Sequence, residues 1–222
     1  MFRDRTEAGQ LLAQKLIRYK DQPGVVVLGL ARGGMPVASE VAKGLHAPLD
    51  VFVVRKLGVP GQKELAMGAT ASGKVRVLND PIINALGISP ATIEAVAAKE
   101  EDEIEQRERL YRGARPSIEV ENKKIILIDD GLATGSTMRA AVLALRRQHP
   151  ASIIVAVPVA AVSTCEDLKH EVDEIVCLLT PENFFAVGQW YEDFSQTTDE
   201  EVEELLRCAA VTVSPTDGFG QA

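Results

Sequence analysis

The chain has 222 residues, of which 46% are hydrophobic, and its formal net charge is −8 at pH 7. This length and apolar content can supply the core of one α/β domain with an accessory lobe, expected to span residues 1–222. The acidic balance argues against a general nucleic-acid or anionic-membrane surface, because both need a basic footprint.

The cysteines and the N-terminus carry information about the cellular compartment. Cys165, Cys177 and Cys208 show no C-x-x-C spacing, which favours reduced thiols that pack inside a cytoplasmic protein. The N-terminus is charged, and nowhere do about 18 apolar residues run together. We therefore expect neither a signal peptide nor a membrane span.

Helices and strands alternate through the first part of the chain. Apolar residues at helical spacing predict a helix over 8–16, and the strand 25–28 follows Pro23-Gly24. A helix over 35–44 and a strand over 50–54 come next. This order is typical of a parallel α/β sheet.

The next stretch is predicted to be an insertion. Residues 60–64 form a polar loop rich in Pro and Gly, and residues 66–71 and 74–78 indicate a hairpin. Ser89 as N-cap and Pro90 as first helical residue begin a long charged helix that runs to about residue 112. Its apolar stripe is thin. A solvated arm is the favoured interpretation, and a cap over the active site or a dimer contact is the alternative.

The alternation of strand and helix then resumes. We expect strands over 125–128, 153–157 and 174–178, with helices over 135–148 and near 163–170 between them. The fold class is therefore α/β, with a Rossmann-like, right-handed parallel sheet flanked by helices. A last helix is expected over 199–208.

The most informative segment follows the strand 125–128. Asp129 and Asp130 stand at its carboxyl end, where ligands bind in open α/β sheets. A small, hydroxyl-rich turn then opens a helix; it comprises Gly131, Leu132, Ala133, Thr134, Gly135, Ser136 and Thr137. Such a turn presents backbone N–H groups and hydroxyls to an anion, whereas paired carboxylates favour sugar hydroxyls or a divalent cation. A ribose 5-phosphate satisfies both requirements.

Other interpretations of this segment are weaker. A Walker A loop needs a different glycine spacing and a lysine, and no G-x-G-x-x-G fingerprint of dinucleotide sites is present. Asp130 and Thr134 could simply satisfy backbone donors in an Asx turn and an N-cap. A plain cap, however, does not call for two carboxylates and three hydroxyls within nine residues.

Basic residues are predicted at the same sheet edge. Arg32 with Gly33 and Gly34 follows the first parallel strand, and Arg55 and Lys56 follow the second. Lys63 lies in the predicted loop over 60–64. Cations gathered in these loops of an acidic chain suit an anionic ligand, whereas the plain alternative is a glycine-rich turn with a solvated arginine.

Aromatic residues cluster after the last strand. Phe184, Phe185 and Trp190 fall in this segment and allow two interpretations. They could stack on a ring of the ligand. They could equally form a satellite core for the helix over 199–208.

These segments together resemble the type I phosphoribosyltransferases, and above all the stand-alone prokaryotic members of unassigned substrate. The resemblance rests on residues 31–34, 55–58, 129–137 and 181–195, and it covers nearly the entire chain. It implies a core over about 1–58 and 120–180. It also implies a loop, hairpin and charged-helix insertion over about 59–119, and a hood over about 180–210.

The resemblance also implies roles for the candidate residues. Asp129 and Asp130 would hold the ribose hydroxyls and, through water, Mg2+, while the turn over 132–137 would bind the 5-phosphate. Pyrophosphate would bind to the cations and glycines of the first two loops, which are Arg32, Gly33, Gly34, Arg55 and Lys56. Lys63 would contribute from a mobile basic loop. The hood would accept a nitrogenous base on Phe184, Phe185 or Trp190.

The expected function is Mg2+-dependent transfer of the phosphoribosyl group from phosphoribosyl pyrophosphate (PRPP) to a nitrogenous base, with release of pyrophosphate. Ala133 stands where hypoxanthine and guanine enzymes of this superfamily have an aspartate base, whereas adenine enzymes have alanine there. The acceptor must therefore lose its proton by other means or arrive as an anion. The alternatives are a sensor of PRPP or a nucleotide and, more weakly, a phosphohydrolase. A homodimer is expected by resemblance alone.

Overall fold

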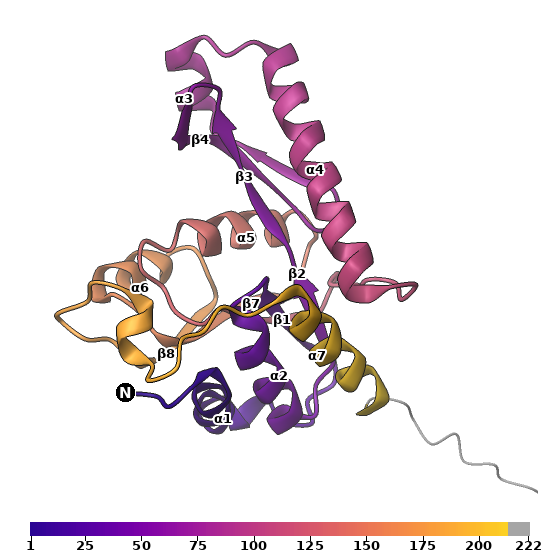
Figure 1. The fold of residues 1–222 in the computed structure, drawn as a ribbon, viewed down its shortest axis with the longest axis vertical. Helices are drawn as coiled ribbons and strands as arrows, with labels where there is room; N and C mark the ends of the chain where they lie inside the picture. Colours follow the sequence, from indigo (N-terminus) through magenta and orange to yellow (C-terminus); the bar gives the residue numbers. More distant parts are fainter. Residues whose placement is uncertain (213–222) are drawn as a thin grey trace, which may run out of the picture.

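The computed structural model describes residues 1–212, except for the side chains of residues 63, 64 and 210–212. Its centre is a parallel sheet of five strands in the order β2-β1-β6-β7-β8 (Figure 1). The strands are β1 (Val25–Leu30), β2 (Leu49–Phe52), β6 (Lys124–Ile128), β7 (Ser152–Val159) and β8 (Glu174–Leu179). The predicted α/β class and parallel sheet are confirmed.

Helices cover both faces of this sheet, which explains why its central strands are almost continuously apolar. Successive residues of β6 alternate between two core clusters, with Ile126 and Ile128 in one and Ile125 and Leu127 in the other. The first cluster includes residues of α1 (Arg5–Lys15), α2 (Gly34–Leu45) and α7 (Asp199–Thr212). The second includes residues of α5 (Ser136–Arg146) and α6 (Val162–Leu168).

A second, antiparallel sheet lies between β2 and β6 in the chain, in the order β3-β4-β5 (Figure 1). Its strands are β3 (Val54–Val59), β4 (Gln62–Ala71) and β5 (Val75–Leu78), and α3 (Asp80–Leu86) and α4 (Pro90–Arg112) follow. The predicted hairpin around Ser72-Gly73 is confirmed as β4–β5. The short helix α3 was not predicted, although Asn79 caps it by accepting a hydrogen bond from Ile82 N.

The predicted polar loop over 60–64 is wrong. Pro60-Gly61 is a tight turn with Gly61 at φ +83°, and β4 already begins at Gln62. The predicted strand over 50–54 is also divided, because β2 ends at Phe52 and β3 starts a different sheet at Val54. A local apolar pattern cannot distinguish one strand from two short strands that pair with different partners.

The predicted long helix is confirmed as α4, with Ser89 Oγ accepting a hydrogen bond from Thr92 N at 3.1 Å. Its favoured interpretation as a solvated arm is wrong. Ile93 and Ala97 form a core with β3 and β4, and Ile104 and Tyr111 join the main core. Figure 1 shows α4 running along the hairpin and down to α7.

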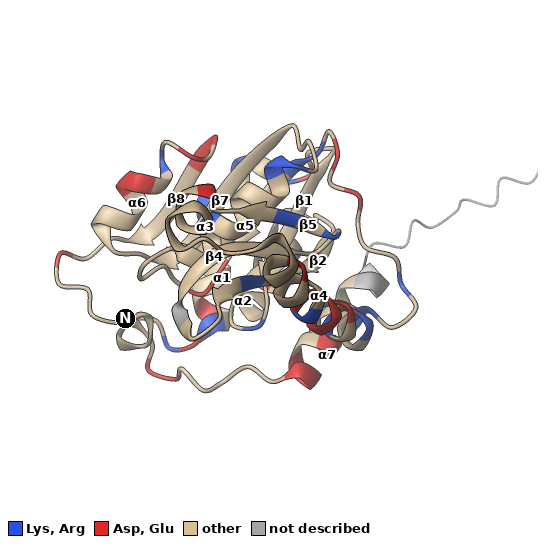
Figure 2. Ribbon diagram, turned by 90° about the horizontal axis from the view of Figure 1, so that it is seen from above, with Lys and Arg blue, Asp and Glu red and all other residues tan. Residues whose placement is uncertain are grey.

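Paired charges explain how α4 packs despite its thin apolar stripe. Arg55, Lys74 and Arg76 of the antiparallel sheet each form an ion pair with a glutamate of α4. Figure 2 shows both acidic and basic residues on this helix. The side chain of Leu110, which belongs to the predicted apolar stripe, is 49% exposed.

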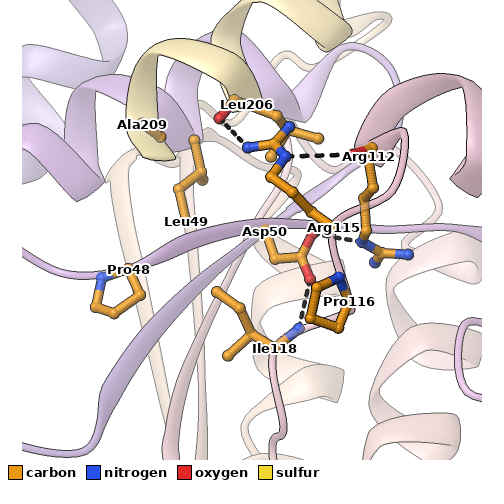
Figure 3. Close-up of a pocket in the computed structure, with 9 residues that line it drawn as sticks. All are labelled: Pro48, Leu49, Asp50, Arg112, Arg115, Pro116, Ile118, Leu206 and Ala209. Atoms are coloured by element: carbon orange, nitrogen blue, oxygen red, sulfur yellow. Dashed lines mark hydrogen bonds and ion pairs between the residues drawn. The ribbon is translucent and has the colours of Figure 1, made fainter. Parts of the chain in front are cut away.

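The C-terminal end of α4 is fixed to the parallel sheet by a buried ion pair (Figure 3). Arg112 Nε donates to Asp50 Oδ1 at 2.7 Å, and Arg112 Nη2 donates to the carbonyl oxygen of Val51 at 2.7 Å. Asp50 Oδ2 accepts a hydrogen bond from Ile118 N at 2.9 Å. The ion pair lies on β2, an outer strand of the sheet, which β1 separates from β6, the strand that precedes Asp129 and Asp130.

The prediction that the three cysteines are reduced thiols packed in the interior is confirmed only in part. Cys165 on α6 and Cys177 on β8 are thiols whose Sγ atoms lie 2.6 Å apart, and Cys165 is buried in the core. Cys208, by contrast, is exposed on α7, so the prediction that it packs in the interior is wrong. Within residues 1–212 no helix has the length and apolar character needed to cross a membrane.

Replacing Arg112 with methionine should destabilise the fold strongly, because Asp50 would remain buried without its cation. Loss of one partner of a buried pair costs about 3–5 kcal/mol. Arg109→Met on the same helix is the control, since the Arg109 side chain is 77% exposed and its pair with Glu105 should contribute less than about 1 kcal/mol. Urea unfolding followed by circular dichroism measures both variants. Equal losses would contradict a clamping role for Arg112.

Candidate functional site

Two adjacent carboxylates stand at the carboxyl end of β6. Asp129 Oδ1 accepts a hydrogen bond from Asp130 N at 2.9 Å. Burial raises the pKa of Asp129 well above its usual value, and the negative charge of Asp130 raises it further. Burial also raises the pKa of Asp130, although the nearby Arg5 opposes that effect. Acidic groups held in such an unfavourable environment are typical of functional sites.

Gly33 and Gly34 allow the β1–α2 turn to approach these carboxylates. A Cβ on Gly33 would lie 2.3 Å from Asp130 Oδ2, and one on Gly34 would lie 2.6 Å from the carbonyl oxygen of Ile128. The two glycines are therefore required by close approach rather than by a positive φ. The neighbouring peptide bond between Ala31 and Arg32 is cis.

The turn after Asp130 forms a shallow cradle at the start of α5. A cavity of about 190 Å³ is lined by Asp129, Val187 and the turn itself, residues 131–138. Gly135 is the N-cap, at φ +67°, and provides no side-chain cap. The first N–H groups of α5 are thus left for water or an anion. Thr134 Oγ1 and Ser136 Oγ lie 3.3 Å apart beside them.

Two contacts hold the cradle in shape. Thr164 Oγ1 of α6 donates to the carbonyl oxygen of Ala133 at 2.6 Å. Leu132 N donates to the carbonyl oxygen of Val159 at 2.9 Å, and the Leu132 side chain is buried in the core. Both the N–H and the side chain of Leu132 are therefore engaged within the protein, and Leu132 helps to hold the cradle in place.

Arg5, at the start of α1, is a site residue that the sequence analysis missed. Its Nε and Nη2 atoms both lie 2.9 Å from Asp130 Oδ2, and its Nη1 donates to the carbonyl oxygen of Ser195 at 2.7 Å. The guanidinium carbon lies 4.0 Å from the centroid of the Phe194 ring. No local pattern signals these contacts, because Arg5 and Asp130 are 125 positions apart.

A second cavity, of about 360 Å³, lies beside Asp130. It is lined by Arg5, Arg32, Gly33, Asp130, Phe194, Gln196 and Thr197. Arg32 Nη1 also lies 3.8 Å from Asp199 Oδ2 at the start of α7. The structure thus brings the predicted residues Arg32 and Gly33 together with the aspartates.

The remaining predicted cations are not in loops, so that part of the prediction is wrong. Arg55 and Lys56 lie on β3, and Arg55 Nε pairs with Glu100 of α4 at 2.8 Å. Lys56 instead lines a cavity of about 500 Å³ between the hairpin and α5, which reaches Ser136 of the cradle. Lys63 lies in β4, and its side chain is outside the described part of the structure.

The predicted stacking residues mostly pack elsewhere. Phe184 and Trp190 lie against a cluster that includes Phe2 and Tyr191, and the Phe185 side chain is 82% exposed. The satellite-core interpretation therefore describes Phe184 and Trp190. The N-terminal segment completes this cluster, however, whereas α7 belongs to the main core.

Two other aromatic residues of the hood approach the aspartates. Tyr191 Oη donates to the backbone carbonyl oxygen of Asp130 at 2.6 Å, and burial raises the pKa of Tyr191. Phe194 lines the 360 Å³ cavity. The sequence did signal an aromatic cluster, but it could not show which rings face the site.

Comparison with known proteins gives a consistent result. The family model described as "Phosphoribosyl transferase domain" matches residues 5–194. Two Mycobacterium tuberculosis proteins, each named "Putative phosphoribosyl transferase" (MT0597 and Rv0571c), are 46% identical to the chain over 206 residues. The match covers 93% of this chain and 46% of theirs, so the chain spans about half the length of these relatives.

A solved structure supports the same assignment. TT1426 from Thermus thermophilus is 42% identical with a TM-score of 0.82, and the match covers 92% of this chain and 97% of that chain. Both sequence and fold therefore agree with the matched model, and the chain belongs to the phosphoribosyl transferase domain family.

Proposed function

We propose that this protein transfers the phosphoribosyl group of PRPP to a nitrogenous base and releases pyrophosphate. One observation carries the proposal, namely that the half-buried pair Asp129 and Asp130 is followed by a turn that leads into the uncapped N-terminus of α5. The carboxylates would accept hydrogen bonds from the ribose hydroxyls, and the cradle over 131–137 would hold the 5-phosphate. In the substrate, the ribose hydroxyls and the 5-phosphate belong to the same sugar, so one molecule can reach both parts of the site.

The donor set of the site fits Mg2+. Mg2+ prefers hard oxygen ligands, and Asp129 and Asp130 supply two adjacent carboxylates. Such a site suits an ion shared with substrate oxygens and water. Asp129 and Asp130 would hold it through water, where it would neutralise charge on the leaving pyrophosphate.

Positioning and charge would supply most of the catalysis. Departure of pyrophosphate leaves an oxocarbenium-like sugar, which neighbouring carboxylates stabilise. Arg32 and the backbone at Gly33 and Gly34 are placed to bind the pyrophosphate near Asp130. Lys56 on β3 would add a positive charge, since its ammonium group forms no ion pair with the described residues.

The acceptor would enter the 360 Å³ cavity next to Phe194. Neither this cavity nor the cradle is lined by a histidine, and Ala133 carries no carboxylate. The acceptor would therefore arrive as an anion or lose its proton to solvent. Asp129 and Asp130, the carboxylates beside these cavities, are assigned to the ribose hydroxyls, which leaves no further base among the described lining residues to activate water and disfavours a phosphohydrolase.

A sensor of PRPP or a nucleotide is the second candidate. It is favoured by the ion pair of Arg55 with Glu100 and by the closeness of Arg32 to Asp199, since both reduce the positive charge available to a leaving pyrophosphate. Release of pyrophosphate on addition of any base would identify an enzyme. Binding of PRPP without such release would support the sensor.

Wild-type protein should bind PRPP in the presence of Mg2+, and the Asp129→Asn, Asp130→Asn double variant should lose this binding. Isothermal titration with and without Mg2+ measures both proteins. Asp102→Asn, at an exposed position of α4, is the control and should bind as wild type does. No binding by wild-type protein would overturn the assignment of PRPP as the ligand.

Lys56→Gln should weaken the binding of PRPP about tenfold, because a hydrogen bond to a charged group contributes about 1.5–3 kcal/mol. Ribose 5-phosphate should bind as before, since it lacks the pyrophosphate. Lys99→Gln, an exposed residue of α4, is the matched control in the same titrations. Equal weakening of both ligands would place Lys56 at the 5-phosphate instead.

Asp129→Asn should stabilise the protein at pH 7. The folded-state pKa of Asp129 is raised above its ordinary value of 3.8, so its ionised form is penalised as the pH rises through that folded pKa. Asparagine keeps the acceptor for Asp130 N. The gain should shrink as the pH falls through the folded pKa and should vanish below 3.8, where the carboxyl is protonated in both states. Thermal unfolding between pH 4 and 7 tests this, with Asp102→Asn as control; no gain at pH 7 would contradict it.

A further inference from the structure

Arg5 joins three parts of the molecule that are distant in sequence. Its guanidinium contacts Asp130 after β6, the carbonyl oxygen of Ser195 and the ring of Phe194 in the hood. The side chain of Arg5 is 11% exposed and that of Asp130 is 14% exposed. A charged pair with so little solvent around it is held in a defined geometry.

The backbone beside Arg5 is also part of the hood. Phe2 N donates to the carbonyl oxygen of Trp190 at 2.7 Å, and Glu192 N donates to that of Phe2 at 2.8 Å. Asp193 N donates to the carbonyl oxygen of Arg3 at 2.9 Å. The first residues of the chain therefore run parallel to the hood segment, and the hood brings Arg5 to Asp130.

We propose that Arg5 is a positioning residue of the ribose subsite, which fixes one oxygen of Asp130 and couples the orientation of this carboxylate to the hood. Both close donors of Arg5 contact Oδ2, so Oδ1 stays available to a ribose hydroxyl or a metal-bound water. The stacking on Phe194 connects the same guanidinium to the cavity assigned to the acceptor. The ribose part of this inference rests on the proposed function.

A lysine cannot replace Arg5 in this role. The contacts with Asp130 and Ser195 come from three nitrogens of one planar group that also stacks on a ring, whereas an ammonium is a compact point charge. Arg5→Lys therefore keeps the positive charge but cannot form the three contacts of the planar guanidinium at once. Arg3→Lys is a matched control from the same segment, because the Arg3 side chain is 65% exposed and pairs only with its neighbour Asp4 among the described residues.

The coupling of Arg5 to the hood can be tested without any ligand, through the fluorescence of Trp190, the single tryptophan of the chain. Its Nε1 is buried and lacks a hydrogen-bond partner within the described structure, so its fluorescence reports on hood packing. Quenching by acrylamide should increase in Arg5→Lys and stay at the wild-type value in Arg3→Lys. An unchanged value in Arg5→Lys would overturn the coupling to the hood.

The ribose subsite is tested by titration with two probes, ribose 5-phosphate and inorganic phosphate. Arg5→Lys should bind ribose 5-phosphate about tenfold more weakly, the loss expected for a misplaced charge-assisted hydrogen-bond acceptor. Inorganic phosphate should bind equally to both proteins, because Arg5 does not line the cradle. A loss of both ligands, or of neither, would overturn the positioning role.

The outcomes separate this inference from the proposed function. If wild-type protein binds neither PRPP nor ribose 5-phosphate, the proposed function fails, and the ribose part of the inference fails with it. If wild-type protein binds both and Arg5→Lys binds them equally well, only the inference fails. Should Arg5→Lys not fold, as judged by circular dichroism, Arg5→Gln serves as the second variant, because it keeps an amide donor at similar length.

Discussion

The structure is organised around two carboxylates whose ionised forms lose free energy of hydration when they are removed from water. Asp129 and Asp130 lie side by side at the end of β6, and burial raises the pKa of both. Three neighbouring segments pack around them. The β1–α2 turn approaches through Gly33 and Gly34, Arg5 compensates one negative charge, and α5 turns its uncapped N-terminus toward the same edge. A fold selected for stability alone would place apolar side chains here, which is why the proposed function is centred on these two carboxylates.

The antiparallel sheet and α4 form a structural unit that depends on charge pairing as well as on apolar packing. Its core is small, and glutamates of α4 pair with basic residues of β3, of β5 and of the turn between β4 and β5. Arg112 then fixes the end of α4 to β2 through Asp50. As a result the hairpin lies against α5, and Lys56 lines the cavity that reaches the cradle. The position of one candidate cation thus depends on contacts that α4 makes with β2, an outer strand of the parallel sheet.

Asp129, Asp130 and the turn over 131–137 lie within the residues that match the phosphoribosyl transferase domain model. The aromatic residues of the hood divide between two environments. Tyr191 and Phe194 face the site, while Phe184 and Trp190 pack against the N-terminal segment. Because that segment also supplies Arg5, the N-terminal segment and the hood meet at the aspartates.

The sequence by itself determined the parallel sheet, the boundaries of α4 and the candidate site around Asp129 to Thr137. These features depend on local periodicity, capping residues and turn chemistry, which short segments encode. Only the tertiary structure decided that Arg55 and Lys56 lie on a strand, that α4 is packed rather than solvated, and that Arg5 belongs to the site. Each of these outcomes depends on a partner distant in sequence, such as Glu100 for Arg55 and Asp130 for Arg5. The physical reason is that pairing and burial are properties of the assembled chain, so a local pattern shows which side chains are available and the fold decides which of them meet.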